Sequence, residues 1–310
     1  MIGNFEGKHI LHGNQFSNED LDRIMTVADE FEKGLEKGQT YDLMKGKILA
    51  ALFFEPSTRT RLSFESAMLS LGGGVISVAS AATSSAAKGE SIGDTALTVS
   101  QYAHVMVMRH PEIGSAAEAA AVATVPVINA GDGAGQHPTQ ALLDAYTIKK
   151  EIGALDGIKV SLVGDLKYGR TVHALVELLS LYDIGLRLVS PASLKMPGDI
   201  VERLKQKGME IIETENLVEA AAESDLMYVT RIQKERFSDI KDYEKIKGVY
   251  VINEALLEKA KKGVVIMHPL PRVDEISESV DSYEGAAYFR QVRNGVYVRM
   301  ALLALVLGIK

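Results

Sequence analysis

Short apolar runs alternate with longer segments whose apolar positions recur at helical spacing along nearly the whole chain. Short apolar runs bounded by Gly, Pro and polar residues predict buried strands, and the segments between them predict amphipathic helices. In the first half the predicted strands cover 47–53, 74–78, 104–108 and 125–129. In the second half they cover 158–163, 185–189, 209–212, 225–229, 249–252 and 264–267. Strands that alternate with helices predict an α/β fold with parallel sheets.

A glycine-rich segment separates these two series of strands. Residues 131–135 read Gly-Asp-Gly-Ala-Gly, and a helical pattern covers 138–152 soon after them. Glycine gives a loop freedom to bend and lets its backbone approach a ligand closely. We therefore expect the chain to cross from one domain to a second here. The spacing of the last helical pattern, 288–308, does not decide whether that helix packs back on the first domain.

Composition narrows the class of protein without indicating a function. The 310 residues are 46% hydrophobic and 24% charged, which is typical of one large globular domain or two ordinary ones. The net charge of -7 argues against a general nucleic-acid or membrane-surface binder. The absence of cysteine excludes disulfides, thiolate nucleophiles and zinc–cysteine sites in this chain. The N-terminus lacks a signal-peptide pattern, and the apolar stretch 296–307 is short and contains Arg299, so we expect a cytoplasmic protein.

The most specific chemical pattern follows the first predicted strand. Pro56 ends that strand, and Ser57, Thr58, Arg59 and Thr60 come directly before a helical pattern. A helix N-terminus has unpaired N–H groups and the positive end of the helix dipole. Hydroxyl and guanidinium groups added there form a site for phosphate or a similar oxyanion. A capped helix with surface arginines is the alternative, but capping needs only one hydroxyl.

Arg109, His137 and Gln140 are further candidates in the first half. Arg109 directly follows a predicted strand, where its charge is costly unless it is paired, so we expect either a salt bridge or a ligand oxyanion. His137 begins a helix and shares one helical face with Gln140. A lone histidine is usually structural, but the helix N-terminus favours a neutral ring that can donate to a substrate carbonyl. We expect no metal, because no second His, Asp or Glu stands at ligand spacing beside His137.

Two motifs in the second half suit a carboxylate ligand. The segment 164–171 follows a strand but lacks the G-x-G-x-x-G spacing of a nucleotide-binding turn. Arg170 at the start of a helix is poorly placed for the helix dipole, which favours a carboxylate ligand or an acidic protein partner beside it. Arg231 and Gln233 fall on the same side of an extended chain, and a guanidinium with an amide suits a carboxylate.

The last motif, 268–272, follows the strand 264–267, and Pro269 or Leu270 offers a backbone carbonyl to a donor. By composition alone, the segment 83–90 is a flexible surface loop. All the other motifs come after predicted strands, and parallel sheets bind ligands beyond the carboxyl ends of their strands. Their shared placement therefore predicts one site.

The motifs resemble, in their order along the chain, those of the catalytic chains of aspartate carbamoyltransferases. They are residues 54–61, 108–111, 137–140, 164–171, 230–236 and 268–272. The resemblance covers essentially the whole length. It implies transfer of a carbamoyl group from carbamoyl phosphate to L-aspartate in pyrimidine synthesis, without a cofactor. It also implies two doubly wound parallel-sheet domains joined by interdomain helices, with the C-terminal helix packing back on the first.

The same resemblance assigns domains and roles to the residues. The carbamoyl-phosphate-binding domain would be 1–134 plus 291–310, and the aspartate-binding domain 135–290. Carbamoyl phosphate would be bound by Ser57, Thr58, Arg59, Thr60, Arg109, His137, Gln140, Pro269 and Leu270. The catalytic residues among these would be Arg59, Thr60, Arg109 and His137. Aspartate would be bound by Lys88, Arg170, Thr171, Arg231 and Gln233.

The resemblance further implies an active site shared between copies of the chain. Ser84 and Lys88 would reach into a neighbouring subunit's site, which requires a homotrimer. Relatives often carry a second lysine or a glycine near positions 86 and 87, and both are alanine here. Lys88 is therefore the only cation of this loop. Catalytic trimers of the family either act alone or join regulatory chains, as two trimers with three regulatory dimers in a dodecamer.

Two other functions compete with this interpretation. An ornithine carbamoyltransferase shares the fold and the first substrate, but its pattern has a Ser-Met-Gly loop and a His-Cys-Leu-Pro motif. This chain has Arg231-Ile232-Gln233 and His268-Pro269-Leu270-Pro271 instead. A non-catalytic anion-binding homologue would usually have lost a charged site residue, and the sequence lacks none of them.

Overall fold

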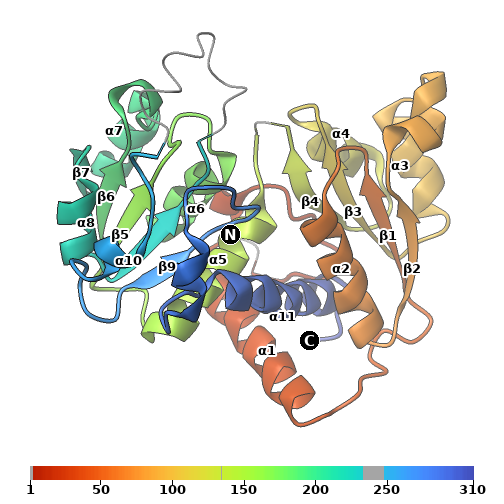
Figure 1. Ribbon diagram of the computed structural model, residues 1–310. Coiled ribbons are helices and arrows are strands. Elements are labelled where there is room, and N and C mark those ends of the chain that lie inside the picture. Colours follow the sequence, from red (N-terminus) through yellow and green to blue (C-terminus); the bar gives the residue numbers. More distant parts are fainter. Residues whose placement is uncertain (1–2, 134, 233–247) are drawn as a thin grey trace. The chain divides into compact units, whose positions relative to one another are not determined.

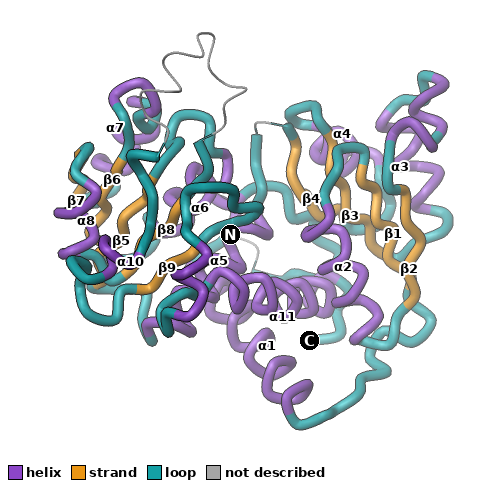
Figure 2. The backbone as a smooth tube through the Cα atoms, in the orientation of Figure 1, coloured by secondary structure: helices purple, strands orange, loops and turns teal. Residues whose placement is uncertain are grey.

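The computed structural model describes residues 3–133, 135–232 and 248–310, and these form two compact units (Figure 1). Unit 1 comprises Met1–Tyr146 and Val292–Lys310, and unit 2 comprises Thr147–Gln291. Each unit contains a parallel sheet with helices around it (Figure 2), which confirms the predicted fold class. No helix in the described ranges is long and apolar enough to cross a membrane.

The sheet of unit 1 has four parallel strands in the order β2-β1-β3-β4. They are β1 (Ile48–Phe53), β2 (Gly74–Val78), β3 (Val105–His110) and β4 (Val127–Asp132). The inner strand β1 is buried from Leu49 to Phe53, whereas the edge strand β2 alternates between exposed and half-buried positions. The register pairs Phe53 with Arg109, which brings the carboxyl ends of β1 and β3 together.

The helices of unit 1 begin where capping residues stop the extended chain. They are α1 (Asn18–Glu36), α2 (Thr58–Ser70), α3 (Ile92–Ser100) and α4 (Ser115–Val122), with 3-10 turns η1 (Gly13–Gln15), η2 (Ala81–Thr83) and η3 (Ser85–Lys88). In α1 the Ser17 Oγ accepts from the Asp20 N–H at 3.2 Å, and the Asp20 carboxylate accepts from the Ser17 N–H at 2.9 Å. This reciprocal capping box fixes the first turn of the helix.

The sheet of unit 2 has five parallel strands in the order β7-β6-β5-β8-β9. They are β5 (Ile158–Val163), β6 (Ile184–Val189), β7 (Glu210–Thr214), β8 (Leu226–Val229) and β9 (Val265–Met267). The order reverses direction between β5 and β8, which is the doubly wound arrangement that places a ligand site beyond these two strand ends. The helices are α6 (Arg170–Leu179), α7 (Gly198–Gln206), α8 (Leu217–Glu223) and α10 (Glu254–Leu257), with 3-10 turns η4 (Ala192–Leu194) and η6 (Glu278–Ser282).

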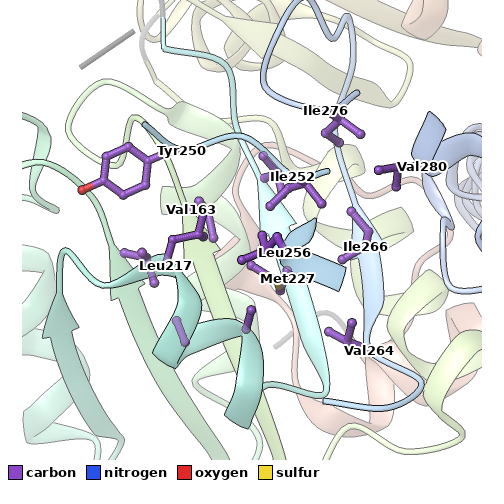
Figure 3. Close-up of a cluster of buried hydrophobic side chains, with 14 of the residues drawn as sticks. Val163, Leu217, Met227, Tyr250, Ile252, Leu256, Val264, Ile266, Ile276 and Val280 are labelled. Atoms are coloured by element: carbon purple, nitrogen blue, oxygen red, sulfur yellow. The ribbon is translucent and has the colours of Figure 1, made fainter. Parts of the chain in front are cut away.

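The strand predicted at 249–252 is wrong. Ile252 makes only an isolated bridge to Ile276, and the edge strand on that side is β9. Tyr250 and Ile252 are instead buried in the core cluster that covers this part of the sheet, together with Leu217 and Ile266 (Figure 3). The apolar pattern at 249–252 therefore reflects packing against the sheet rather than strand pairing.

Two long helices run from one unit into the other. Helix α5 (Pro138–Ile152) starts in unit 1 and ends in unit 2, and α11 (Tyr288–Val306) starts in unit 2 and ends in unit 1. The last helix thus packs on unit 1, as the family resemblance implied. Residues 135–146, which we expected in the second domain, group with unit 1 because Tyr146 hydrogen-bonds to Asp29 and Glu32 of α1.

Candidate active site

Helix α2 begins beyond the carboxyl end of β1, at the first predicted motif. Ser57 is its N-cap residue, but in the described part of the chain the Ser57 hydroxyl makes no capping hydrogen bond. In α3, by contrast, the Ser91 hydroxyl accepts from the Asp94 N–H at 3.0 Å. Thr58 and Arg59 are exposed and Thr60 is buried. The first turn of α2 thus combines N–H groups that Ser57 does not cap with hydroxyls and a guanidinium, a combination that binds oxyanions.

Arg109 occupies the end of β3 and is only 9% exposed. Its Nε donates to Glu55 Oε2 at 3.0 Å, and its Nη1 donates to the Ala130 carbonyl oxygen at 3.4 Å. The salt bridge to Glu55 offsets the cost of burying the guanidinium. Because a guanidinium has five N–H donors, this pairing is compatible with a ligand oxyanion as a further acceptor.

Gly131 brings Arg109 and His137 together. Its φ of +117° is one that side-chain-bearing residues rarely adopt. A Cβ placed on Gly131 would lie 3.3 Å from Arg109 Nη1 and 3.6 Å from His137 Cδ2. Both side chains therefore lie against the backbone of this glycine. The close approach to the backbone that glycine allows in 131–135 is made here by two side chains of the protein.

His137 and Gln140 are both buried at the start of α5. The hydroxyl of Thr139 lies 3.5 Å from His137 Nδ1. Gln140 Nε2 donates to Asp144 Oδ1 at 2.9 Å, and Asp144 is completely buried. Since the amide nitrogen faces the carboxylate, Gln140 Oε1 is the group that can accept from a ligand N–H.

Two buried residues that the sequence did not single out shape the loop before α5. Asp132 accepts from the Gln136 N–H at 2.6 Å and from the Gly114 N–H at 2.9 Å. Asn129 accepts from the Gly131 N–H at 2.8 Å. These bonds hold the loop against β4 and thereby fix the position from which His137 enters α5.

Ser84 and Lys88 lie in a different place within unit 1. Ser84 caps the short turn η3, accepting from the Ala86 N–H at 3.3 Å, and Lys88 is the exposed last residue of that turn. Both line a pocket of about 580 Å³ together with Val78 and Thr95. Of the described residues, none from 57–60 and neither Arg109 nor His137 lines it. The loop thus contributes to a pocket that these anion-binding residues do not line, although Phe54 of the motif 54–61 does.

In unit 2, the loops that carry Arg170 and Arg231 meet beyond the ends of β5 and β8. The register pairs Val163 with Val229, and the Thr230 hydroxyl donates to the Val163 carbonyl at 3.0 Å. A Cβ on Gly164 would come within 2.3 Å of the Thr230 carbonyl oxygen, so only glycine fits this approach. Arg170 and Thr171 open α6 and are half-buried, as is Arg231. Gln233 and Arg236 lie outside the described residues.

The loop after β9 is held by a buried histidine and glutamate. His268 Nδ1 accepts from the Leu270 N–H at 2.7 Å, so Nε2 is the nitrogen that donates to Glu275 Oε1 at 2.6 Å. Burial raises the pKa of Glu275, but the hydrogen bond from His268 opposes this, and the net pKa lies below its usual value. Leu270 has a φ of +55° and precedes a cis Leu270–Pro271 bond.

The candidate residues therefore form two sets, one in each unit. Unit 1 holds the first turn of α2 with Arg109, His137 and Gln140, and unit 2 holds Arg170, Thr171, Arg231, Pro269 and Leu270. Glu55 and Asp144 are partners of site residues that were not predicted. A sequence signal existed for both, since Glu55 lies inside the motif 54–61 and Asp144 is four residues after Gln140 on the same helical face.

Comparison with known proteins matches both units. A family model described as "Aspartate/ornithine carbamoyltransferase, carbamoyl-P binding domain" matches residues 8–150, and one described as "Aspartate/ornithine carbamoyltransferase, Asp/Orn binding domain" matches 156–306. An aspartate carbamoyltransferase catalytic subunit of Thermococcus onnurineus is 55% identical over 98% of each chain. The catalytic subunit of an aspartate transcarbamoylase from M. jannaschii is 51% identical over 96% of each chain, with a TM-score of 0.91. An aspartate transcarbamoylase from Trypanosoma cruzi, in complex with N-(phosphonacetyl)-L-aspartic acid, is 44% identical over 98% of this chain and 97% of that one, with a TM-score of 0.93.

Proposed function

Since the chain belongs to the aspartate/ornithine carbamoyltransferase family, we propose that it transfers the carbamoyl group of carbamoyl phosphate to the amino group of L-aspartate. The products are N-carbamoyl-L-aspartate and phosphate, in de novo pyrimidine synthesis. The relatives of similar length are named for aspartate rather than ornithine, and they match this chain from end to end. The observation that carries the proposal is the placement of Arg109 and His137 against Gly131 at the sheet edge where α2 begins.

In this proposal, unit 1 binds carbamoyl phosphate. Ser57, Thr58, Arg59 and Thr60 hold the phosphate, because the first turn of α2 offers hydroxyl, guanidinium and backbone N–H donors to a dianion. Arg109 bridges the phosphate and the carbonyl oxygen. Thr60 and His137 join it in polarising that carbonyl, and Gln140 Oε1 accepts from the carbamoyl amide because its nitrogen is taken by Asp144.

Unit 2 supplies the residues for aspartate. Arg170 and Arg231 bind its two carboxylates, with Thr171 and Gln233 beside them, since guanidinium groups pair with carboxylates in bidentate geometry. The backbone carbonyls of Pro269 and Leu270 accept from the carbamoyl nitrogen. We propose 1–134 with 291–310 as the carbamoyl-phosphate-binding domain and 135–290 as the aspartate-binding domain, with His137 and Gln140 of the second range completing the carbamoyl-phosphate site.

The chemistry that these residues support is direct attack of the aspartate amine on the carbamoyl carbon. Holding both reactants in register removes much of the entropic barrier. Donors from Thr60, Arg109 and His137 stabilise the oxyanion of the tetrahedral transition state, each worth on the order of 3 kcal/mol. The C–O bond to phosphate then breaks, and the departing phosphate accepts the amine proton, so no protein base is required.

We further propose that the active enzyme is a cytoplasmic homotrimer. Ser84 and Lys88 reach the active site of a neighbouring subunit, and Lys88 there contributes to aspartate binding. The pocket that these residues line in unit 1 includes none of the described anion-binding residues, which supports a role outside their own site. Two such trimers with three regulatory dimers would form a dodecamer.

Product identification tests the proposal. The purified chain is incubated with carbamoyl phosphate and either L-aspartate or L-ornithine, and the carbamoylated amino acid is identified by mass spectrometry. We expect carbamoyl aspartate and no citrulline. Citrulline without carbamoyl aspartate would identify an ornithine enzyme, and phosphate binding without either product would identify a non-catalytic homologue.

A further inference from the structure

Arg299 is a buried charge in the apolar part of α11 to which the proposed mechanism gives no role. Its side chain is almost wholly enclosed, with 3% of the residue exposed. Burial lowers its pKa to about 10, and attraction to Asp144 opposes this. Burying an arginine that has no structural or functional role destabilises a protein, because removing the guanidinium from water costs several kcal/mol.

The contacts of Arg299 lead to two parts of the proposed carbamoyl-phosphate site. Its Nη1 donates to the Ser63 hydroxyl on α2 at 2.9 Å, and its guanidinium lies over the Phe64 ring at 5.1 Å. Ser63 and Phe64 lie one turn after the anion-binding residues 57–60. One buried cation on the C-terminal helix thus fixes α2 just behind its first turn.

The second connection runs through Asp144. This completely buried carboxylate interacts electrostatically with Arg299 and accepts from Gln140 Nε2 at 2.9 Å. The Gln140 amide nitrogen is the donor in this bond, so the amide oxygen of Gln140 faces away from Asp144. Asp144 therefore holds the Gln140 amide with its nitrogen inward and its oxygen available to a ligand.

The fold makes room for this arrangement at Gly295. A Cβ there would lie 2.5 Å from Arg299 Nη1 and 3.1 Å from the Leu143 side chain. Within the described part of the chain, Arg299 Nε has no hydrogen-bond partner. The described contacts of the side chain are thus its hydrogen bond to Ser63, its attraction to Asp144 and the face of the Phe64 ring.

We propose that Arg299 is a positioning residue for carbamoyl-phosphate binding, acting through Asp144 on Gln140 and through Ser63 on α2. The proposal rests on the function proposed above. Losing the guanidinium should therefore weaken the binding of carbamoyl phosphate more than the binding of aspartate, because Arg299 contacts or influences residues assigned to carbamoyl phosphate.

The test compares Arg299→Met with Arg187→Met in steady-state assays of both substrates. Arg187 is a similarly buried arginine of β6, paired with Glu223 in unit 2 and outside the proposed site. We expect Arg299→Met to raise the KM for carbamoyl phosphate by about 10-fold or more, with a smaller change for aspartate. Arg187→Met should lower the unfolding midpoint and leave both KM values within about twofold.

If Arg299→Met does not fold, Arg299→Lys and a double-mutant cycle with Gln140→Ala keep the test decisive. Lysine retains the charge but not the planar fork, and we expect it to raise the KM for carbamoyl phosphate by about 3-fold or more. In the Gln140→Ala variant, the Arg299 substitution should raise the KM for carbamoyl phosphate by a smaller factor than in wild type. The reason is that Asp144 no longer has a Gln140 amide to position. Unchanged KM values, or fully additive effects, would overturn the positioning role. Absence of activity in the wild-type chain would instead refute the proposed function.

Discussion

Arg109 Nε donates to Glu55 Oε2 at 3.0 Å, so the arginine that ends β3 is paired with the residue that precedes Pro56. The carboxylate fixes one edge of the guanidinium. We expect Glu55→Gln to lower kcat/KM for carbamoyl phosphate by about 10-fold or more, since the buried arginine loses its charged partner.

Glu65→Gln is the matched control for Glu55. Glu65 also pairs with an arginine of unit 1, Arg61, but at 3.8 Å, and the Arg61 side chain is more exposed than that of Arg109. Its loss should change kcat/KM by less than about twofold. Equal effects of the two substitutions would show that the Arg109–Glu55 contact has no special part in catalysis.

The variant His137→Asn should distinguish two roles of His137, polarisation of the substrate carbonyl and acceptance of the amine proton. Removing one donor to a developing oxyanion typically lowers kcat about 100-fold to 1000-fold. If phosphate takes the amine proton, the residual activity should keep the shape of the wild-type pH–rate profile. A limb of the profile that disappears in the variant would mean that His137 is the base.

Arg231→Met should raise the KM for aspartate by about 100-fold or more while leaving the affinity for carbamoyl phosphate nearly unchanged. Arg290→Met is the control, because Arg290 also belongs to unit 2 but pairs with Glu151 at 2.7 Å on the surface. Steady-state kinetics with each substrate varied in turn measures both. An unchanged KM for aspartate in Arg231→Met would remove this residue from the aspartate site.

The proposed sharing of the site between subunits predicts complementation between two inactive variants. Assemblies of Lys88→Ala and of His137→Ala are dissociated, mixed in equal amounts and reassembled. If each site combines His137 of one chain with Lys88 of its neighbour, about a quarter of the sites in random hybrids are intact. Activity that stays at the level of the parents would show that both residues serve the same chain's site, or that chains do not assemble.

His173 predicts a pH dependence of stability. Burial lowers its pKa below 6.5 although its hydrogen bond to the Leu166 carbonyl, at 2.8 Å, opposes the shift. As pH falls through 6.5, the unfolded chain binds a proton that the folded chain does not yet bind, so the free energy of unfolding decreases. His173→Gln, which keeps an N–H donor, should flatten this decrease in urea unfolding at a series of pH values. Parallel curves for the two proteins would contradict it.

The sequence predicted most of the sheet architecture because central strands of parallel sheets are buried on both faces and form continuous apolar runs. It failed at 249–252, where Tyr250 and Ile252 are buried by packing against the sheet instead of pairing. An apolar run in the sequence indicates that a segment is buried, but not whether it pairs as a strand. A paired strand and a segment that only packs on the sheet therefore have the same pattern.

Except for Ser84 and Lys88, which only the family resemblance indicated, the candidate residues were found because their motifs follow predicted strands. Their partners required the folded chain. Glu55 and Arg109 are far apart in sequence, and the register of β1 and β3 brings them together. Arg299 meets Ser63 only because α11 returns to unit 1. Contacts of this kind depend on tertiary packing, which the spacing of apolar residues does not encode.

The central claim is that carbamoyl phosphate binds through Arg109 and L-aspartate binds through Arg231, and calorimetric titration with N-(phosphonacetyl)-L-aspartate tests it most directly. This compound carries the phosphate-like and dicarboxylate groups in a single molecule. The account predicts tight binding to the wild type that competes with carbamoyl phosphate, and at least about 100-fold weaker binding both in Arg109→Met and in Arg231→Met. Undiminished binding in either variant would contradict it.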